Sequence, residues 1–152
     1  MRLKKTTDFL RIFSLGGMLY VSLEFFWRER SHWSMALLGG TCLFGLYRIR
    51  LRFGRTHRFV KCVLGGLFIT AAELATGYAF NRDRKIWDYS RMPLNFKGQI
   101  CLPYSVLWSL LCLPADTLCG SFSRYAEAPR KSILKKYSEN HRAVKQAIKH
   151  QF

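Results

Sequence analysis

The sequence predicts an all-α membrane protein, a polytopic bundle of four transmembrane helices followed by a basic amphipathic C-terminal helix. The 152 residues are 49% hydrophobic and include 25 Lys and Arg against 9 Asp and Glu. These two kinds of residue are segregated, because four long apolar stretches alternate with short segments that are dense in charge. Four spans of about 20 residues need roughly 80 residues, which leaves enough chain for basic loops and tails.

The expected spans, in chain order, are residues 9–27, 31–47, 59–81 and 98–119. The first follows a basic N-terminus and resembles a secretory signal, but Glu24 interrupts it and no small-x-small cleavage site follows, so an uncleaved span is favoured. The second carries no charge, Glu73 is the only acid of the third, and Asp116 lies near the end of the fourth. Helices that stay apolar around their whole circumference suit lipid better than a soluble core.

Two domains follow from this division, a membrane domain over residues 1–123 and a cytoplasmic tail over residues 124–152. From Pro129 the tail reads as one helix with an apolar face and many basic residues on its polar surface. A basic amphipathic helix binds anionic lipid headgroups or docks on a partner protein.

The distribution of Lys and Arg predicts the orientation. The N-terminus, the segment between the second and third spans, and the tail together carry seventeen, whereas the two remaining loops carry seven. The positive-inside rule then places both termini in the cytoplasm of a multi-pass cell-membrane protein. The net charge of +16 is thereby explained without nucleic-acid binding, since the basic residues are not gathered on one soluble domain.

Spans one and three share a pattern that suggests an internal repeat of two hairpins. Leu15-Gly16-Gly17 precedes Glu24 by the same spacing with which Leu64-Gly65-Gly66 precedes Glu73. Two tandem hairpins related by an axis along the membrane normal would explain it, whereas chance is the alternative, because glycine pairs are common in membrane helices.

The sequence carries no recognisable metal site, cofactor site or catalytic motif. Its five cysteines are odd in number and form no C-x-x-C, which argues against disulfides and zinc. The absence of a G-x-x-x-x-G-K-[ST] phosphate loop excludes a self-contained ABC transporter. We therefore expect neither a cofactor nor an enzyme.

Acids within spans point to a polar site, because such residues normally face protein or water. Glu24 has Arg28 one turn later, and Glu73 shares a helix face with Asn81. One interpretation is a cavity that opens outward and binds an ion or polar headgroup; the other is a set of hydrogen bonds or ion pairs that fix helix packing.

The loop over residues 81–99 adds turn and interface residues, and we expect it to be ordered and to dip over the cavity. The alternative is an interfacial belt without a ligand. The candidate binding residues are Glu24, Arg28, Glu73, Asn81, Trp87, Asp88, Tyr89, Ser90, Asn95 and Gln99.

These residues also carry a family resemblance. The series Glu73…Gly77…Asn81…Trp87-Asp88-Tyr89-Ser90…Pro93…Asn95…Gly98-Gln99, with Gly17…Tyr20…Glu24…Arg28 before it, resembles the putative ABC-transporter type IV (CmpB-like) family of small bacterial membrane proteins. Trp-Asp-Tyr-Ser is its most specific part. The resemblance implies a multi-span, permease-like protein and brings no substrate or catalytic residue.

Three functions remain open at this stage. The first is a transport component, self-assembled or joined to a separate ATPase or other membrane subunit. The second is a non-transporting scaffold or regulatory subunit. The third is an intramembrane enzyme acting on lipid or cell envelope, with Glu73, Asp88, Tyr89 and Ser90 as its acid–base group.

Overall fold

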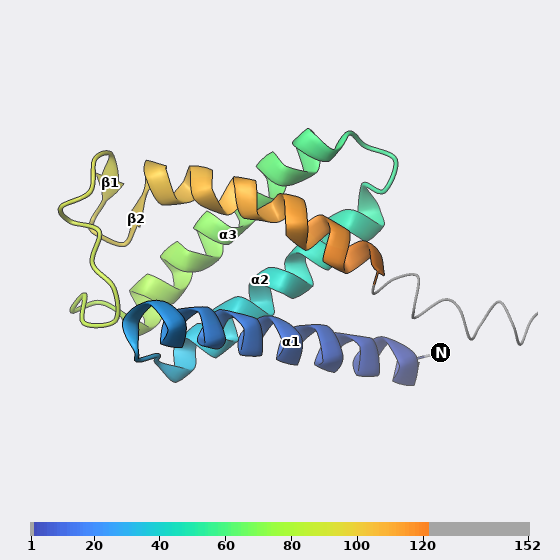
Figure 1. The fold of residues 1–152 in the computed structure, drawn as a ribbon, viewed down its shortest axis with the longest axis horizontal. Helices are drawn as coiled ribbons and strands as arrows, with labels where there is room; N and C mark the ends of the chain where they lie inside the picture. Colours follow the sequence, from blue (N-terminus) through green and yellow to red (C-terminus); the bar gives the residue numbers. More distant parts are fainter. Residues whose placement is uncertain (1, 122–152) are drawn as a thin grey trace, which may run out of the picture. The chain divides into compact units, whose positions relative to one another are not determined.

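A computed structural model describes residues 2–121, with side chains from residue 7 onward. In chain order it contains α1 (Arg2–Arg28), α2 (Trp33–Arg52), α3 (Arg58–Phe80), β1 (Asn95–Phe96), β2 (Ile100–Cys101) and a helix over Leu102–Ser121 (Figure 1). The helical class predicted from the sequence is confirmed. The basic helix predicted after Pro129, and the tail from residue 124, lie outside the described residues.

Three of the described helices are long and apolar enough to cross a membrane, namely Thr7–Arg28, Arg58–Phe80 and Leu102–Ser121. At a rise of 1.5 Å per residue, the 23 residues of α3 extend over about 34 Å, which exceeds a hydrocarbon core of about 30 Å. The length and composition of these three helices fit a membrane protein. α2 is not among the three, because Arg48, Arg50 and Arg52 in its last turns lower its mean hydropathy.

Glycines bring α1 and α2 into contact along their backbones. A Cβ atom added to Gly39 would lie 2.6 Å from the carbonyl oxygen of Gly16, and one added to Gly17 would lie 2.8 Å from that of Ala36. A side chain at either glycine would clash at these distances, so only glycine permits the close approach, as in membrane helix pairs that pack through small residues. The partner numbers fall along α2 as they rise along α1, so the two helices are antiparallel (Figure 1).

The second glycine pair packs in the same manner against the helix that ends the described chain. A Cβ atom added to Gly65 would meet Cys112 Sγ, and one added to Gly66 would collide with Ser109. One turn further along, Thr70 Oγ1 donates a hydrogen bond to Ser105 Oγ at 3.0 Å. Gly65 also lies close to Leu46 of α2, so this glycine pair packs against helices of both proposed hairpins.

Histidines begin two of the helices. The Nδ1 atom of His32 accepts a hydrogen bond from the backbone N–H of Ser34 at 3.3 Å, and His57 Nδ1 accepts one from Phe59 at 3.3 Å. Side-chain acceptors at this position satisfy N–H groups that the first turn of a helix leaves unpaired.

The last span begins later than expected, because residues 95–101 form a β hairpin in place of helix. Asn95 pairs with Cys101 and Phe96 with Ile100. Lys97 and Gly98 both have positive φ, at 52° and 68°, and the N–H of Gln99 donates to the carbonyl of Phe96 at 3.0 Å. Positive φ at both central residues is typical of the type I′ turns that close tight hairpins.

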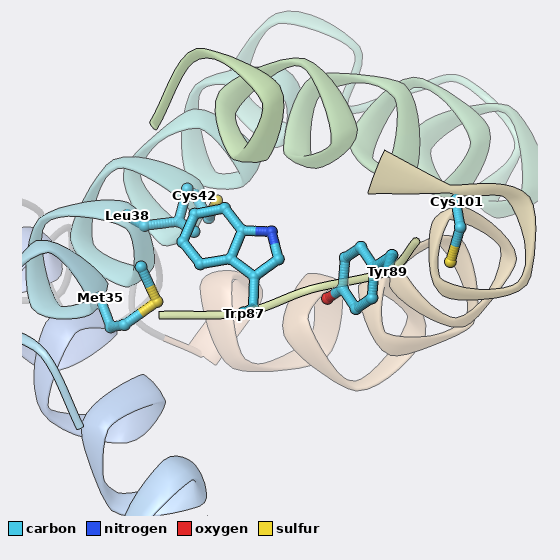
Figure 2. Close-up of a cluster of buried hydrophobic side chains, with 6 residues drawn as sticks. All are labelled: Met35, Leu38, Cys42, Trp87, Tyr89 and Cys101. Carbon is cyan, nitrogen blue, oxygen red and sulfur yellow. The ribbon is translucent and has the colours of Figure 1, made fainter. Parts of the chain in front are cut away.

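The segment that precedes the hairpin packs into the helices. Trp87 and Tyr89 are buried in a cluster with Met35, Leu38 and Cys42 of α2 and with Cys101 of β2. Figure 2 shows the two aromatic side chains in this cluster, with Trp87 beside the α2 residues. The aromatic residues thus hold the loop by packing into the helices, whereas the sequence indicated order through turn-forming residues.

At the opposite end of α3, Asp116 is surrounded by basic side chains. Its carboxylate lies 2.7 Å from Arg50, 3.2 Å from Lys61 and 3.9 Å from Arg58. Lys61 is only 7% exposed, so its ammonium group depends on this carboxylate. The cluster ties together the end of α2, the start of α3 and the helix Leu102–Ser121.

Candidate functional site

A cavity of about 420 Å³ lies among α1, α2, α3 and the helix Leu102–Ser121. Leucines form much of its wall, and Tyr89 enters it from the loop. Its charged side chains are Glu24, Arg28 and Glu73. A volume of 300–1,000 Å³ with a mostly apolar wall and few polar groups is typical of small-molecule sites.

Glu73 is the most enclosed acid of the cavity, at 3% exposure. The hydroxyl of Tyr89 donates to its Oε1 atom at 2.9 Å, and the indole N–H of Trp108 donates to its Oε2 atom at 3.0 Å. Burial raises the pKa of the Tyr89 hydroxyl far above its ordinary value, and the Glu73 charge raises it further. Tyr89 therefore stays protonated and keeps its role as donor.

Glu24 and Arg28 form a second polar group at the end of α1. Ser31 Oγ donates to Glu24 Oε2 at 2.7 Å, and Arg28 Nη1 lies 3.8 Å from Glu24 Oε1. Arg28 also donates to the carbonyl oxygen of Ile86 at 3.1 Å. The i,i+4 spacing that suggested this pair thus produces it, and the same arginine joins α1 to the loop.

Asn81 and Gln99 hold the two ends of the loop together. Asn81 is 1% exposed, and its side chain donates to the carbonyl of Trp87 at 2.7 Å and accepts from the N–H of Ile86 at 2.8 Å. Gln99 Nε2 donates to the Asn81 carbonyl at 2.8 Å, and its own carbonyl accepts from the Trp87 indole at 2.9 Å. The network satisfies buried backbone groups that would otherwise be unpaired.

Asp88, Ser90 and Asn95 shape the exposed side of the loop. Asp88 Oδ1 accepts from the N–H of Ser90 at 2.8 Å, and this hydrogen bond holds the pKa of Asp88 below its ordinary value. Asn95 donates to the carbonyls of Ser90 and Met92 at 3.2 and 2.9 Å. These are turn-forming contacts.

The ten candidate residues thus divide into three groups. Those that line the cavity are Glu24, Arg28, Glu73 and Tyr89. Those buried at the base of the loop are Asn81, Trp87 and Gln99, and those exposed on it are Asp88, Ser90 and Asn95. Tyr89 reaches Glu73, whereas no contact among the described residues joins Asp88 or Ser90 to it, so the four members of the acid–base group do not converge.

Three aromatic residues of the cavity were not among the candidate binding residues drawn from the sequence. Tyr20 and Tyr104 line it together with Trp108. The rings of Tyr89 and Tyr104 stack with centroids 4.7 Å apart, and the centroids of Tyr104 and Trp108 are 6.1 Å apart. Tyr104 and Trp108 are four residues apart in one helix, which was the available signal that they share a face.

Comparison with family models shows to which protein family the chain belongs. The model of the Putative ABC-transporter type IV family matches residues 9–134. The chain belongs to this family. Family membership and three helices suited to crossing a membrane fit a membrane protein of transport type, for which association with other membrane or ATPase subunits is an expectation. Comparison with curated proteins and with solved structures finds no match.

Proposed function

We propose that this protein is the permease-like membrane component of a transport system, and that the cavity around Glu73 is its substrate site. The observation that carries the proposal is a cavity of about 420 Å³ that holds two acids and one arginine among four helices. Acids within spans are expensive and commonly mark substrate or ion pathways. Family membership supports the same function.

A four-span topology accompanies the proposal. The link from α1 to α2 covers only residues 29–32, and α2 then packs antiparallel on α1 through Gly39. A helix that returns along a membrane-spanning partner crosses the same membrane, so we count α2 as the fourth span. The arginines at the end of α2 would then lie at the cytoplasmic surface. This agrees with the positive-inside rule, because the two termini and the segment after α2 together carry seventeen Lys and Arg.

The loop then lies on the outer side of the cell membrane, and the cavity opens outward. Cys42 lines the cavity and supplies a test. In a variant that retains Cys42 alone, a membrane-impermeant thiol reagent added outside intact cells should label it. Both cysteines are buried, but Cys119 does not line the cavity and lies at the end of the helix Leu102–Ser121, so a matched variant that retains Cys119 alone should resist the same reagent. Labelling of Cys119 in preference to Cys42 contradicts the orientation.

The transport role can be tested by asking whether the protein binds an ATPase that supplies the energy for transport. Because the sequence holds no nucleotide-binding loop, the tagged protein should co-purify from mild detergent with a separate ATPase. Glu73→Gln should reduce substrate-dependent ATP hydrolysis by that complex, whereas Asp83→Asn, which changes an exposed acid paired with Lys85, should not. A stable complex without any ATPase would count against transport.

A non-transporting scaffold or regulatory subunit is the second candidate, and one observation favours it. Both oxygens of Glu73 already receive hydrogen bonds, from Tyr89 and Trp108, which join the loop and the last helix to α3. In this role Glu73 fixes packing, and the basic tail contacts anionic lipids or a cytoplasmic partner. A stoichiometric partner with no ATPase activity would support it.

A further inference from the structure

The cavity has an excess of one negative charge. Its lining includes two carboxylates and one guanidinium, and Glu24 and Arg28 form an ion pair with each other. Glu73 is left with two neutral donors, and no basic group of the described residues lies within ion-pair distance of it. A buried carboxylate without a cationic partner attracts a cation.

Two aromatic residues contact this carboxylate, and two more pack next to them. Tyr89 and Trp108 contact Glu73 directly, Tyr104 stacks on Tyr89, and the centroid of Tyr20 lies 6.5 Å from that of Trp108. The faces of tyrosine and tryptophan rings attract ammonium groups, and cages of such rings recognise organic cations.

The remaining wall limits the ligand further. It is built largely from leucine and isoleucine, including Leu38, Leu43, Ile69 and Leu111, which favour an apolar body. Among the residues that the structure describes, no group of three or more His, Cys, Asp or Glu side chains could hold a metal ion. A metal ion that needs several such ligands therefore fits this cavity less well than an organic cation.

Resting on the transport function proposed above, we propose that the cavity binds a lipophilic organic monocation, with Glu73 as its counter-ion and Tyr20, Tyr89, Tyr104 and Trp108 as its aromatic cage. The cation would approach the carboxylate between its two hydrogen-bond donors, and the apolar substituents would contact the leucines.

Two probes of matched size and opposite charge test this. Purified protein in lipid nanodiscs should bind tetraphenylphosphonium saturably with a stoichiometry near one, and should bind tetraphenylborate much more weakly, with empty nanodiscs as the blank. Glu73→Gln should weaken binding of the cation by roughly tenfold or more, because a buried charge partner is lost. Asp83→Asn should leave it unchanged. Equal or tighter binding of tetraphenylborate, or cation binding indifferent to Glu73, would overturn the proposal.

A second measurement does not depend on the stability of the Glu73 variant. In the variant that retains Cys42 alone, tetraphenylphosphonium should slow thiol labelling of the cavity, and tetraphenylborate should not. Equal protection by both probes would indicate an unselective apolar cavity and would contradict the charge argument.

These experiments use the isolated protein, so their failure differs from failure of the transport role. Cation binding by a protein that has no ATPase partner would remove the transport function alone. A co-purifying ATPase together with no cation binding would remove only the substrate class.

Discussion

The hydroxyl of Tyr89 lies 2.9 Å from Oε1 of Glu73, which joins the loop to the middle of the bundle by one buried hydrogen bond. Trp108 donates to the other oxygen of the same carboxylate at 3.0 Å. Three elements therefore depend on one side chain, and the geometry of the cavity should respond to each of the three residues.

Tyr89→Phe should destabilise the protein by about 1–3 kcal/mol, because one oxygen of a buried carboxylate loses its donor. Tyr78→Phe is the matched control, since Tyr78 is 41% exposed. The free energy of unfolding in mixed detergent micelles measures the difference. Equal stability of the two variants would show that the Tyr89 hydrogen bond contributes nothing net.

Asn81→Ala should loosen the whole loop. The substitution leaves the N–H of Ile86 and the carbonyl of Trp87 without their partner, at a cost of about 1–3 kcal/mol for each buried group. Trypsin should then cleave faster at Arg82, Arg84 or Lys85. Asn95→Ala also removes hydrogen bonds, but on an exposed surface where water replaces them, so cleavage should rise less. The reverse order would contradict the assignment of Asn81 as the residue that holds the loop.

Gly39→Ala should separate α1 from α2. The added Cβ would collide with Tyr20 and approach the Gly16 carbonyl, and such overpacking costs typically 1–3 kcal/mol. Gly54→Ala places its Cβ 3.3 Å from a single carbonyl oxygen, that of Arg50, and should be nearly neutral. Thermal denaturation in detergent distinguishes them, and an unchanged midpoint for Gly39→Ala would refute the close helix contact.

Asp116→Asn should be strongly destabilising, by about 3 kcal/mol or more, because Lys61 keeps a buried charge without its partner. Adding Lys61→Met removes that charge and should restore much of the loss. A double-mutant cycle measures the coupling. Additive effects of the two substitutions would indicate that the pair does not interact.

The lowered pKa of Asp88 predicts that the structure of the loop depends on pH. Its folded pKa is lower than its ordinary value of 3.8, because the ionised form accepts the hydrogen bond from Ser90. Because its folded pKa is lowered, the ionised carboxyl stabilises the fold fully at pH values above the ordinary pKa. This stabilisation is lost as the pH falls through the folded pKa. Resistance of the loop to pepsin should therefore drop below about pH 4, and Asp88→Asn should remove the part of that drop due to this carboxyl.

Much of the helical framework followed from the sequence, because long uncharged stretches leave a chain few alternatives in lipid. The Leu-Gly-Gly motifs were interpreted only as a possible repeat, and the structure adds that their glycines lie where helices approach closely, at Gly16 and Gly66. The ends of the spans were predicted less accurately. The last helix begins at Leu102 and not at residue 98, because a type I′ turn precedes it and Lys97-Gly98 is not among the dipeptides typical of that turn.

The candidate site could be anticipated only in part. The sequence marked Glu24 and Glu73 as polar residues within spans, and both line the cavity. Asn81 was assigned to the same face as Glu73 by helical spacing, but α3 ends at Phe80, and the Asn81 side chain instead bonds to the loop. Contacts between elements such as Tyr20 and Trp108 depend on how helices pack, which periodicity within one helix does not reveal.

The pairing of Asn81 with Gln99 has a consequence for variation among related chains. Asn81 and Gln99 are the first and last residues of the loop, and hydrogen bonds join them directly. The distance between α3 and the following helix therefore does not depend on the length of the loop between these two residues. Relatives can therefore lengthen or rewrite its tip while conserving the amide pair, and a reporter peptide inserted there should leave the membrane bundle intact.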